Sequence, residues 1–301
     1  MDLTQLTTFR TIASLGSFSQ AADVLGYAQS TVSEQIKNLE MELNTALFKR
    51  AGSKRVALTP AGARLLDYAQ KMSNLEDEIK SEVTNPDEPH GSFSIRIPET
   101  ISQFYLPAWM RRFYRRFSKV NLGFMDCVYF DLPEELKAGI VDLGFLILDQ
   151  FISENLETEI LMPVPLVMVT YPENPLLLNS SVDLSQLRDE PLFTPSNDCS
   201  YSHLLEKILT EQKVRIPNVW RFNSIEALKK VLMSGIGFTV LPEVTVHQDV
   251  QDGRLAVLPW QDGILVSAHL LMIWQKNRWL PPALKAFMDI VRDDLKEKPT
   301  P

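Results

Sequence analysis

The chain has 301 residues, 45% of them hydrophobic, and a formal net charge of −8. This length exceeds the usual size of one domain, so at least two domains with hydrophobic cores are expected. Only two cysteines are present, Cys127 and Cys199, which excludes a disulfide framework and favours a reducing compartment. The N-terminus lacks an export signal and no later segment is apolar over about 18 residues. We therefore expect a cytoplasmic protein that makes no membrane contact.

The charge is distributed unevenly along the chain. Residues 1–65 carry seven basic and five acidic side chains, a net charge of +2, so the remainder carries −10. Binding to a polyanion depends on basic side chains that replace its counterions. An anionic polymer is therefore expected to bind only at the N-terminal end.

Two helix-capping patterns open the chain. Asp2 with Gln5 precedes an amphipathic helix over about 3–14, and Ser17 with Gln20 precedes a second helix. Such spacing lets a side chain accept from a free N–H group in the first turn. The segment from Ser17 to Leu39 is therefore interpreted as two short helices separated by the turn after Gly26, the arrangement of a DNA-reading helix-turn-helix.

The third helix has one apolar and one polar face. Its apolar positions follow a 3.6-residue period: Val32, Ile36, Leu39 and Leu43. The opposite face presents Gln29, Ser30, Thr31, Ser33, Glu34 and Lys37. Small polar side chains allow a helix to enter the major groove, where amides and hydroxyls pair with base edges. An ordinary solvated face is the alternative, and the neighbouring elements favour DNA.

A basic hairpin is predicted next, with strands over 47–50 and 54–58 around a glycine turn. Its basic residues Arg50, Lys54 and Arg55 are expected against phosphates or in the adjacent minor groove, as in the wing of a winged helix. A solvated hairpin is the alternative for each of them.

Thr59 and Pro60 mark a helix start, and no helix breaker follows until Pro86. The resulting helix of about 25 residues carries an apolar seam with heptad spacing: Leu65, Tyr68, Met72, Leu75 and Ile79. Such a seam needs another helix to cover it, which predicts dimerisation. Packing on the chain's own N-terminal domain is the alternative.

The polar segment 85–91, with two prolines and a glycine, is interpreted as a hinge. Strands and helices then alternate: strand 93–97, helix about 103–117, strand 120–126, helix 132–137 and strand 141–148. This βαβαβ pattern predicts a parallel sheet, and ligands of such sheets bind at the carboxyl ends of the strands.

A second set of α/β elements follows, with strands over 164–171, 192–195, 219–222 and 237–241 and helices over 201–212 and 225–233. The strand over 264–274 is expected to cross between two lobes, and Pro281 and Pro282 begin a terminal helix. The fold class is thus α/β and multidomain. The expected bounds are 1–58 for the winged helix-turn-helix, 59–84 for the linker helix, 85–91 for the hinge and 92–301 for a two-lobed domain, with lobe I at about 92–162 and 268–296 and lobe II at about 163–267.

These features resemble the LysR-type transcriptional regulators. The N-terminal match is in register through Gly16-Ser17-Phe18-Ser19, Ala21-Ala22, Gln29-Ser30, Val32-Ser33, Leu47-Phe48 and Leu58-Thr59. Two departures are Asn44, which replaces the usual glycine but tolerates a left-handed backbone, and Ala28, which weakens capping of the third helix.

The resemblance implies a winged helix-turn-helix, a dimer-forming linker helix and an effector domain similar to periplasmic binding proteins. It also implies that a small molecule in the cleft between the lobes controls how the protein binds or bends DNA. The implied partners are double-stranded promoter DNA, an effector of unknown identity and a second copy in a homodimer. A homotetramer is usual in the family, and RNA polymerase is a further candidate partner.

Candidate effector residues lie at strand ends. A helix begins after the first strand of the domain, and its free N–H groups suit an anion. The candidate residues there are Thr100, Ile101, Ser102 and Gln103. Helix capping is the alternative for Thr100 and Ser102, and the neighbouring Glu99 would disfavour an acidic effector. The second lobe contributes Ser196, Asn197 and Asn223.

Two other functions are considered: a DNA-binding regulator that needs no ligand, and an enzyme. The four histidines are widely spaced, and we find no metal-binding pair, phosphate-binding glycine loop or nucleophile elbow. We therefore expect no catalytic residue, no metal site and no cofactor.

Overall fold

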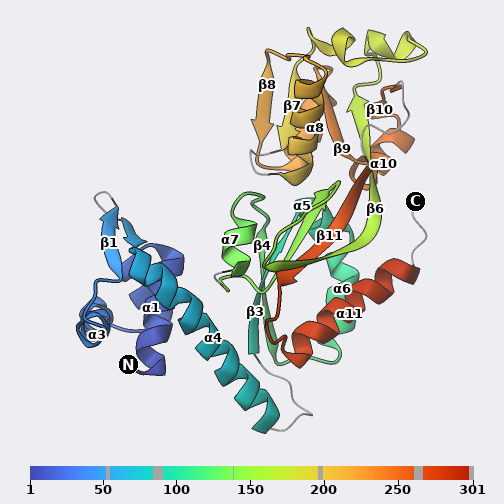
Figure 1. Ribbon diagram of the computed structural model, residues 1–301. Coiled ribbons are helices and arrows are strands. Elements are labelled where there is room, and N and C mark those ends of the chain that lie inside the picture. The colour runs from blue at the N-terminus through green and yellow to red at the C-terminus, as the bar shows by residue number, and fades with distance from the viewer. Residues whose placement is uncertain (52–54, 84–90, 138, 196–198, 261–266, 298–301) are drawn as a thin grey trace.

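The computed structural model describes residues 1–51, 55–83, 91–137, 139–195, 199–260 and 267–297. The N-terminal part consists of α1 (Leu3–Leu15), α2 (Phe18–Leu25), α3 (Gln29–Glu42) and a hairpin of β1 (Phe48–Ala51) and β2 (Arg55–Leu58). Apolar side chains from these elements form one core that includes Leu6, Phe9, Ile12, Val32, Ile36, Leu39 and Leu47. This is the predicted winged helix-turn-helix (Figure 1).

Local sequence signals set the ends of these helices. The side chains of Asp2 and Gln5 each accept from the other's backbone N–H, which confirms the capping box of α1. Ser17 caps α2 by accepting from a backbone N–H in its first turn. Asn44 has a φ of 48°, which confirms the left-handed position after α3. At the other end of α3, Ala28 makes no side-chain capping hydrogen bond, as expected.

The linker helix α4 (Pro60–Val83) begins where predicted, because Thr59 Oγ1 accepts from the N–H of Gly62 at 3.0 Å. Gly62 is required there, since an added Cβ would lie 2.2 Å from the carbonyl oxygen of Leu47. Leu66 and Ala69 are buried in the N-terminal core. One face of α4 thus packs on its own domain, while the helix continues well beyond it (Figure 1).

The effector domain begins with a parallel sheet. Its elements are β3 (Gly91–Ile97), α5 (Glu99–Phe104), α6 (Leu106–Tyr114), β4 (Val120–Asp126), α7 (Leu132–Lys137) and β5 (Leu143–Leu148). Strand β3 pairs in parallel with both β4 and β5, which confirms the βαβαβ pattern. Because the strands are parallel, the carboxyl ends of β3, β4 and β5 lie along one edge of the sheet.

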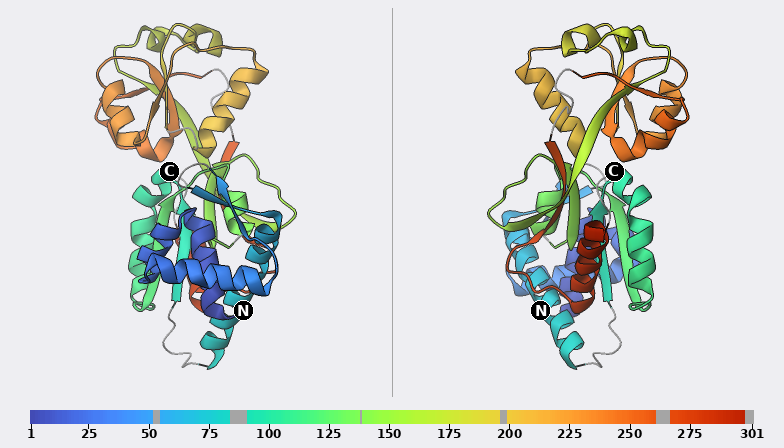
Figure 2. Two further views of the ribbon diagram at one scale, coloured as in Figure 1. Left: turned by 90° about the vertical axis from the view of Figure 1, so that its left-hand side faces the viewer. Right: turned by 90° about the vertical axis from the view of Figure 1, so that its right-hand side faces the viewer.

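The remaining elements complete a sheet in the order β4-β3-β5-β11-β6-β9-β7-β8, with β10 beside β6. They are β6 (Leu156–Thr170), two short 3₁₀ helices (Pro175–Leu178 and Leu184–Leu187), β7 (Leu192–Pro195), α8 (Ser200–Glu211), β8 (Val219–Phe222), α9 (Ile225–Leu232), β9 (Phe238–Pro242), α10 (Glu243–Gln251), β10 (Ala256–Val257), β11 (Ser267–Gln275) and α11 (Pro282–Glu297). Figure 2 shows β6 running from the first lobe, which contains β3–β5 and β11, into the second, which contains β7–β10.

The single helix predicted over about 103–117 is wrong. The structure has two helices, α5 and α6, that meet at Tyr105, whose φ is −118°. Pro107 at the start of α6 has no N–H to donate and its ring excludes the preceding turn, so the chain has to begin a new helix there. The first of the two helices, α5, begins at Glu99, four residues before the predicted start.

The strand predicted over 264–274 is present as β11, and β6, which also runs between the lobes, starts earlier than predicted. Strand β6 pairs with β11 from Leu156 to Pro165 and then with β9 from Leu166. The prediction started this strand at residue 164, where the continuous apolar run begins, although prolines usually exclude a central strand. Here Pro163 and Pro165 lie where β6 changes partners and has one open edge. Residues 264–266 of the predicted strand lie outside the described residues, so β11 is described from Ser267, and the helix α10 was not predicted.

Candidate functional site

The polar face of α3 is exposed. All six side chains predicted to contact DNA are open to solvent: Gln29, Ser30, Thr31, Ser33, Glu34 and Lys37. On the opposite face Val32, Ile36 and Leu39 are buried in the domain core. The helix lies on the side of the molecule away from the effector domain (Figures 1 and 2). A DNA duplex can therefore approach α3 without meeting the rest of the chain.

Two polar contacts fix α3 relative to its neighbours. Thr8 Oγ1 donates to Gln35 Oε1 at 2.6 Å, which joins α1 to α3. The carboxylate of Glu40 accepts from the backbone N–H of Leu47 at 2.7 Å and holds the first strand of the hairpin at the end of α3. Sequence reasoning missed these positioning residues, because each partner belongs to a different element.

The basic hairpin is confirmed as two antiparallel strands in the register Phe48 to Leu58. Arg50 lies opposite Val56 on β1, and Arg55 lies opposite Ala51 on β2. Lys54 lies outside the described residues. Hairpin and α3 belong to one core, so the wing is beside the polar helix, as the prediction requires.

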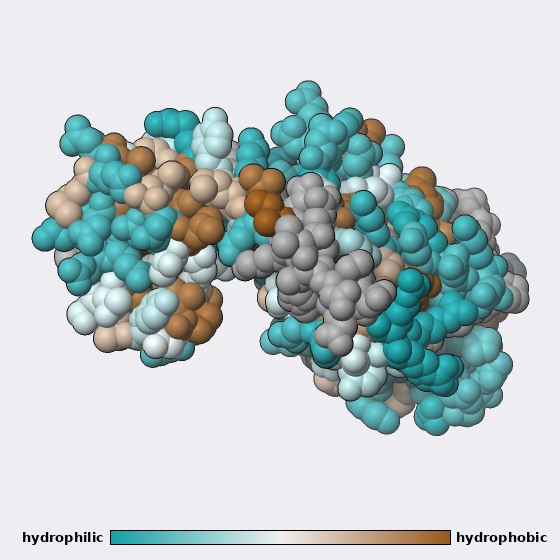
Figure 3. Space-filling model, turned by 90° about the horizontal axis from the view of Figure 1, so that it is seen from below, coloured by the Kyte–Doolittle hydropathy of each residue, from teal (hydrophilic) through white to brown (hydrophobic). Residues whose placement is uncertain are grey.

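The predicted seam on α4 is largely uncovered in a single chain. Tyr68, Met72, Leu75 and Ile79 are 64%, 40%, 55% and 54% exposed, whereas Leu65 packs against the N-terminal core. Seen from below, brown hydrophobic areas interrupt a mostly hydrophilic surface, both on the smaller N-terminal part and near the middle of the view (Figure 3). Four large side chains on one helix are thus at least 40% exposed in the single chain.

A cleft lies between the two lobes, at the carboxyl ends of β3 and β4. Its inner cavity measures about 30 Å³, which is room for one or two water molecules. A wider groove of about 310 Å³ shares three of its residues, Glu99, Asp126 and Asn223. The polar groups that line the inner cavity come from both lobes: Glu99, Thr100, Asp126, Cys199, Tyr201 and Asn223.

The four predicted effector residues of α5 do not all line the cleft. Thr100 is fully buried and lines the cavity, and Ser102 lines the adjoining groove. Ile101 is fully buried in the hydrophobic core, and Gln103 is exposed and lines neither space. The capping alternative is also wrong, because the N-cap is Pro98 and no side chain caps the helix.

Asn223 in the second lobe lines both the inner cavity and the groove. Ser196 and Asn197 lie outside the described residues. The hydroxyl groups of Thr100 and Tyr201 are buried against this cavity near each other and near Cys199, and within the described residues neither makes a hydrogen bond of normal geometry. Buried hydroxyls without a partner are costly, so a bound molecule would gain by pairing with them.

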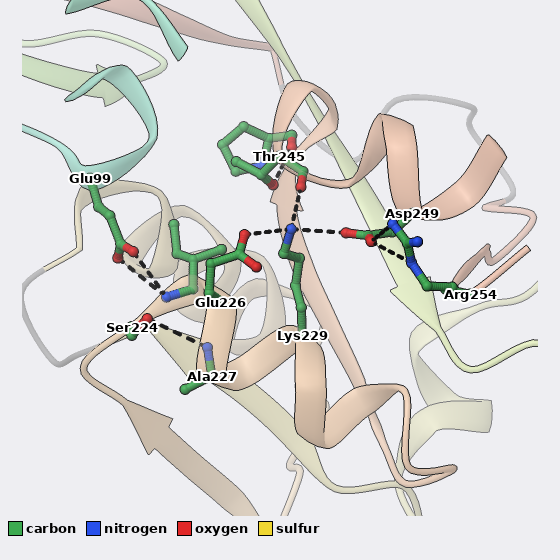
Figure 4. A network of polar contacts seen from close by, with 10 residues as sticks. Glu99, Ser224, Glu226, Ala227, Lys229, Thr245, Asp249 and Arg254 are labelled. Carbon is green, nitrogen blue, oxygen red and sulfur yellow. Dashed lines mark hydrogen bonds and ion pairs between the residues drawn. The ribbon is translucent and has the colours of Figure 1, made fainter. Parts of the chain in front are cut away.

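Within the described residues, polar contacts that join the lobes include the ion pair of Lys207 on α8 with Asp149 after β5, at 3.4 Å, and two hydrogen bonds. The Glu99 carboxylate on α5 accepts from the backbone N–H of Ile225, the first residue of α9, at 3.2 and 3.4 Å (Figure 4). The N–H of Ile147 on β5 donates to Ser200 Oγ at the start of α8, at 3.1 Å. Burial raises the pKa of Glu99, and this effect outweighs the hydrogen bond from Ile225, which acts to lower it.

A buried ion pair supports α9 (Figure 4). Lys229 Nζ donates to Asp249 Oδ2 on α10 at 2.8 Å and to the carbonyl oxygen of Thr245 at 3.0 Å. Burial acts to lower the pKa of Lys229, but the hydrogen bonds to Asp249 and Glu226 outweigh it and raise the pKa. Both partners are therefore charged at neutral pH, and the pair holds α9 against α10.

Both cysteines line the inner cavity. Burial raises the pKa of the Cys127 thiol and raises that of Cys199 to about 11. Because the thiolate is the reactive form, both side chains are poor nucleophiles at neutral pH. Among the described residues no group of histidine, cysteine and carboxylate side chains could hold a metal ion, and no helix is long and apolar enough to span a membrane.

A winged helix-turn-helix with an exposed polar helix, joined by a long helix to a two-lobed domain with a cleft, defines a ligand-responsive DNA-binding regulator. Residues 3–63 match the bacterial regulatory helix-turn-helix protein of the lysR family, and residues 86–296 match the LysR substrate binding domain. The chain belongs to the LysR family of transcriptional regulators.

The relatives agree with this assignment. The uncharacterized HTH-type transcriptional regulator YwqM of Bacillus subtilis is 36% identical over 297 residues, which cover 98% of this chain and 100% of YwqM. A full-length OxyR variant from Pseudomonas aeruginosa superposes with a TM-score of 0.73 at 22% identity, over 99% of this chain and 95% of that one. LysG from Corynebacterium glutamicum with bound effector Arg superposes with a TM-score of 0.66 at 19% sequence identity, over the whole of both chains. The two structural likenesses show the fold alone.

Proposed function

We propose that this regulator reads promoter DNA with the polar face of α3, through Gln29, Ser30, Thr31, Ser33, Glu34 and Lys37, while Arg50, Lys54 and Arg55 of the wing contact the backbone or the minor groove. The observation that carries this proposal is the exposure of all six α3 side chains on the face opposite the buried one. Amides and hydroxyls on such a helix have the reach and polarity to bond base edges.

The active form is a homodimer that pairs through the seam on α4, with a homotetramer as the larger assembly. The exposed apolar residues Tyr68, Met72, Leu75 and Ile79 support this proposal. Two copies place two α3 helices on one duplex, so the operator should contain two half-sites related by the two-fold symmetry of the dimer.

The effector binds in the interlobe cleft and shifts the balance between two arrangements of the assembly, which changes DNA binding or bending. The cavity lies between two lobes joined by the contact of Glu99 with Ile225, so a ligand that displaces or tightens this contact favours one arrangement. Thr100, Ser102 and Asn223 are the predicted effector residues that line the cavity or the groove.

Footprinting of the full-length protein on the DNA upstream of its own gene tests this function. Two protected half-sites about one or more helical turns apart are expected, together with loss of protection in the double variant Gln29→Ala and Ser33→Ala. A protein that protects no half-site, or one whose protection is unchanged in that variant, contradicts the proposal.

A regulator that needs no ligand is the main alternative, and it predicts the same footprint with every metabolite. RNA polymerase is proposed as a partner at the promoter, and the cytoplasm as the location, because the DNA partner is found there. An enzyme is not favoured, since the relatives matched over the whole chain are named as transcriptional regulators.

A further inference from the structure

The charged residues of the interlobe cleft are acidic. Of the described residues that line the inner cavity or the adjoining groove, the charged ones are Glu99 and Asp126, and none is Lys, Arg or His. The two carboxylates are close enough for Asp126 to contribute to the raised pKa of Glu99, after the larger effect of burial. The charged side chains that line the cleft therefore disfavour an anion.

Two basic side chains on elements that border the cleft are already paired. Arg96 on β3 donates from Nε to Glu135 at 2.8 Å and from Nη1 to the carbonyl oxygen of Asp126 at 3.0 Å. Lys229 on α9 is bonded to Asp249 and Glu226. To receive an anion, the cleft would have to break one of these ion pairs, which leaves an uncompensated charge behind.

Three helices begin at the cavity, α5, α8 and α9, and the N-terminus of α9 is already occupied. The first N–H of α9 points to Glu99, as Figure 4 shows, and the N–H of Ala227 donates to the side chain of Ser224. A helix N-terminus favours negative charge because its first N–H groups are free. In this protein the carboxylate of Glu99 already takes that place.

Two buried groups in the cavity need a partner. Thr100 is fully buried and Tyr201 is 2% exposed, and within the described chain neither hydroxyl makes a hydrogen bond of normal geometry. The Oδ1 atom of Asp126 accepts from the N–H of Cys127 at 2.9 Å, and the carboxylate keeps further acceptor positions. The cleft thus offers carboxylate acceptors beside buried hydroxyls.

We propose that the cleft binds a small organic cation, a protonated primary amine that also carries a hydroxyl or another hydrogen-bonding group. The ammonium group lies between Glu99 and Asp126, and the second polar group pairs with Thr100 and Tyr201. An ammonium supplies three donors and no acceptor, which matches two carboxylates. This inference rests on the proposed role of the cleft as the effector site and specifies the charge of the ligand.

Calorimetric titration of the full-length protein with a matched set of ligands tests the charge. Ethanolamine, ethylene glycol and glycolate are nearly equal in size and carry a positive, a zero and a negative charge. Each is titrated at constant ionic strength and neutral pH, up to about 50 mM because ligands with so few atoms bind weakly. We expect ethanolamine to bind at least tenfold more tightly than glycolate, a difference of about 1.4 kcal/mol.

Three variants locate the binding. Asp126→Asn and Thr100→Val keep the shape of each side chain and should each weaken ethanolamine binding, Asp126→Asn by about tenfold. Glu173→Gln removes an exposed carboxylate outside the cleft and should leave the dissociation constant unchanged. A melting temperature for each variant, measured without ligand, separates lost binding from lost folding.

Glycolate binding as tight as ethanolamine binding overturns the inference, as does ethanolamine binding that Asp126→Asn does not weaken or that is absent over the whole range. The proposed function still holds after such a result if a small carboxylic acid, added as the ligand, alters the footprint of the wild-type protein. That ligand should have no effect on the footprint of Thr100→Val. The absence of any protected half-site overturns the proposed function instead.

Discussion

Glu99 and Ile225 connect the two lobes through a hydrogen bond between a side-chain carboxylate on α5 and the first backbone N–H of α9, with an oxygen-to-nitrogen distance of 3.2 Å. The residues are 126 positions apart in the chain. Each belongs to a helix that begins directly at a strand end, so the contact brings the ligand-binding edges of both lobes together. Breaking it removes one of several contacts that join the lobes.

The stability of the protein should depend on the ionisation of Glu99. Its pKa is raised in the folded protein, chiefly by burial, so protonation favours the folded state. This stabilisation is complete below the usual glutamate pKa of about 4.3 and is lost as the pH rises through the raised pKa. The free energy of unfolding of the wild type minus that of Glu99→Gln should therefore fall across this window. Urea denaturation at closely spaced pH values measures it, and a difference that stays flat, like that for the control Glu173→Gln, contradicts the account.

The buried pair of Lys229 and Asp249 gives a second prediction. Lys229 is 6% and Asp249 is 7% exposed, so Lys229→Met leaves a buried carboxylate with Arg254 as its remaining cationic partner. We expect a loss of about 2 to 3 kcal/mol of stability, less than the roughly 3 to 5 kcal/mol for a pair left with no partner. The neighbouring Lys230 is exposed, so Lys230→Met is a matched control. Equal denaturation midpoints for the two variants would refute a structural role for the pair.

The seam on α4 predicts how the protein dimerises. Leu75→Glu or Ile79→Glu places a charge in the proposed interface twice, once from each chain. Loss of two buried leucine-sized side chains costs about 3 kcal/mol or more, which is roughly a hundredfold in the dimer dissociation constant. Leu178→Glu, at a site that is 90% exposed in the second lobe, is the control. Sedimentation equilibrium should show monomers for the α4 variants alone, and an unchanged dimer would exclude this interface.

The two thiols should react slowly in the native protein. With a pKa of about 11 for Cys199, the thiolate fraction near pH 8 is roughly two orders of magnitude below that of a free cysteine with a pKa of about 8.5. Thiol labelling should proceed at the ordinary rate only after unfolding in urea. Rapid labelling of the native protein would show that the cleft opens, or that the thiols are activated.

Much of the fold follows from local sequence signals. The bounds of β4, α7, β7 and β8 agree with the strands and helix predicted for them. The caps at Asp2 and Thr59 and the left-handed Asn44 depend on residues within a few positions of one another. For the same reason the apolar face of α3 and the exposed seam of α4 could be read directly from their periods.

The errors arise where distant residues or proline change the local pattern. The break at Tyr105 depends on Pro107, and the length of β6 depends on partner strands that are distant in the chain, β9 and β11. The carboxylate of Glu99 was recognised as a group facing the cleft, but its partner lies in the other lobe. The sequence did not indicate the buried ion pair of Lys229, because a lysine on a helix is usually exposed to solvent.

The most direct test of DNA reading by α3 is a competition gel shift with the full-length protein and operator variants. Gln29→Ala should lower affinity for the cognate operator by about 1 to 3 kcal/mol and relax the preference at one base-pair position. Gln212→Ala, an exposed glutamine in the effector domain, should change neither. If Gln29→Ala binds every operator variant with the wild-type order of affinities, α3 does not read DNA as proposed.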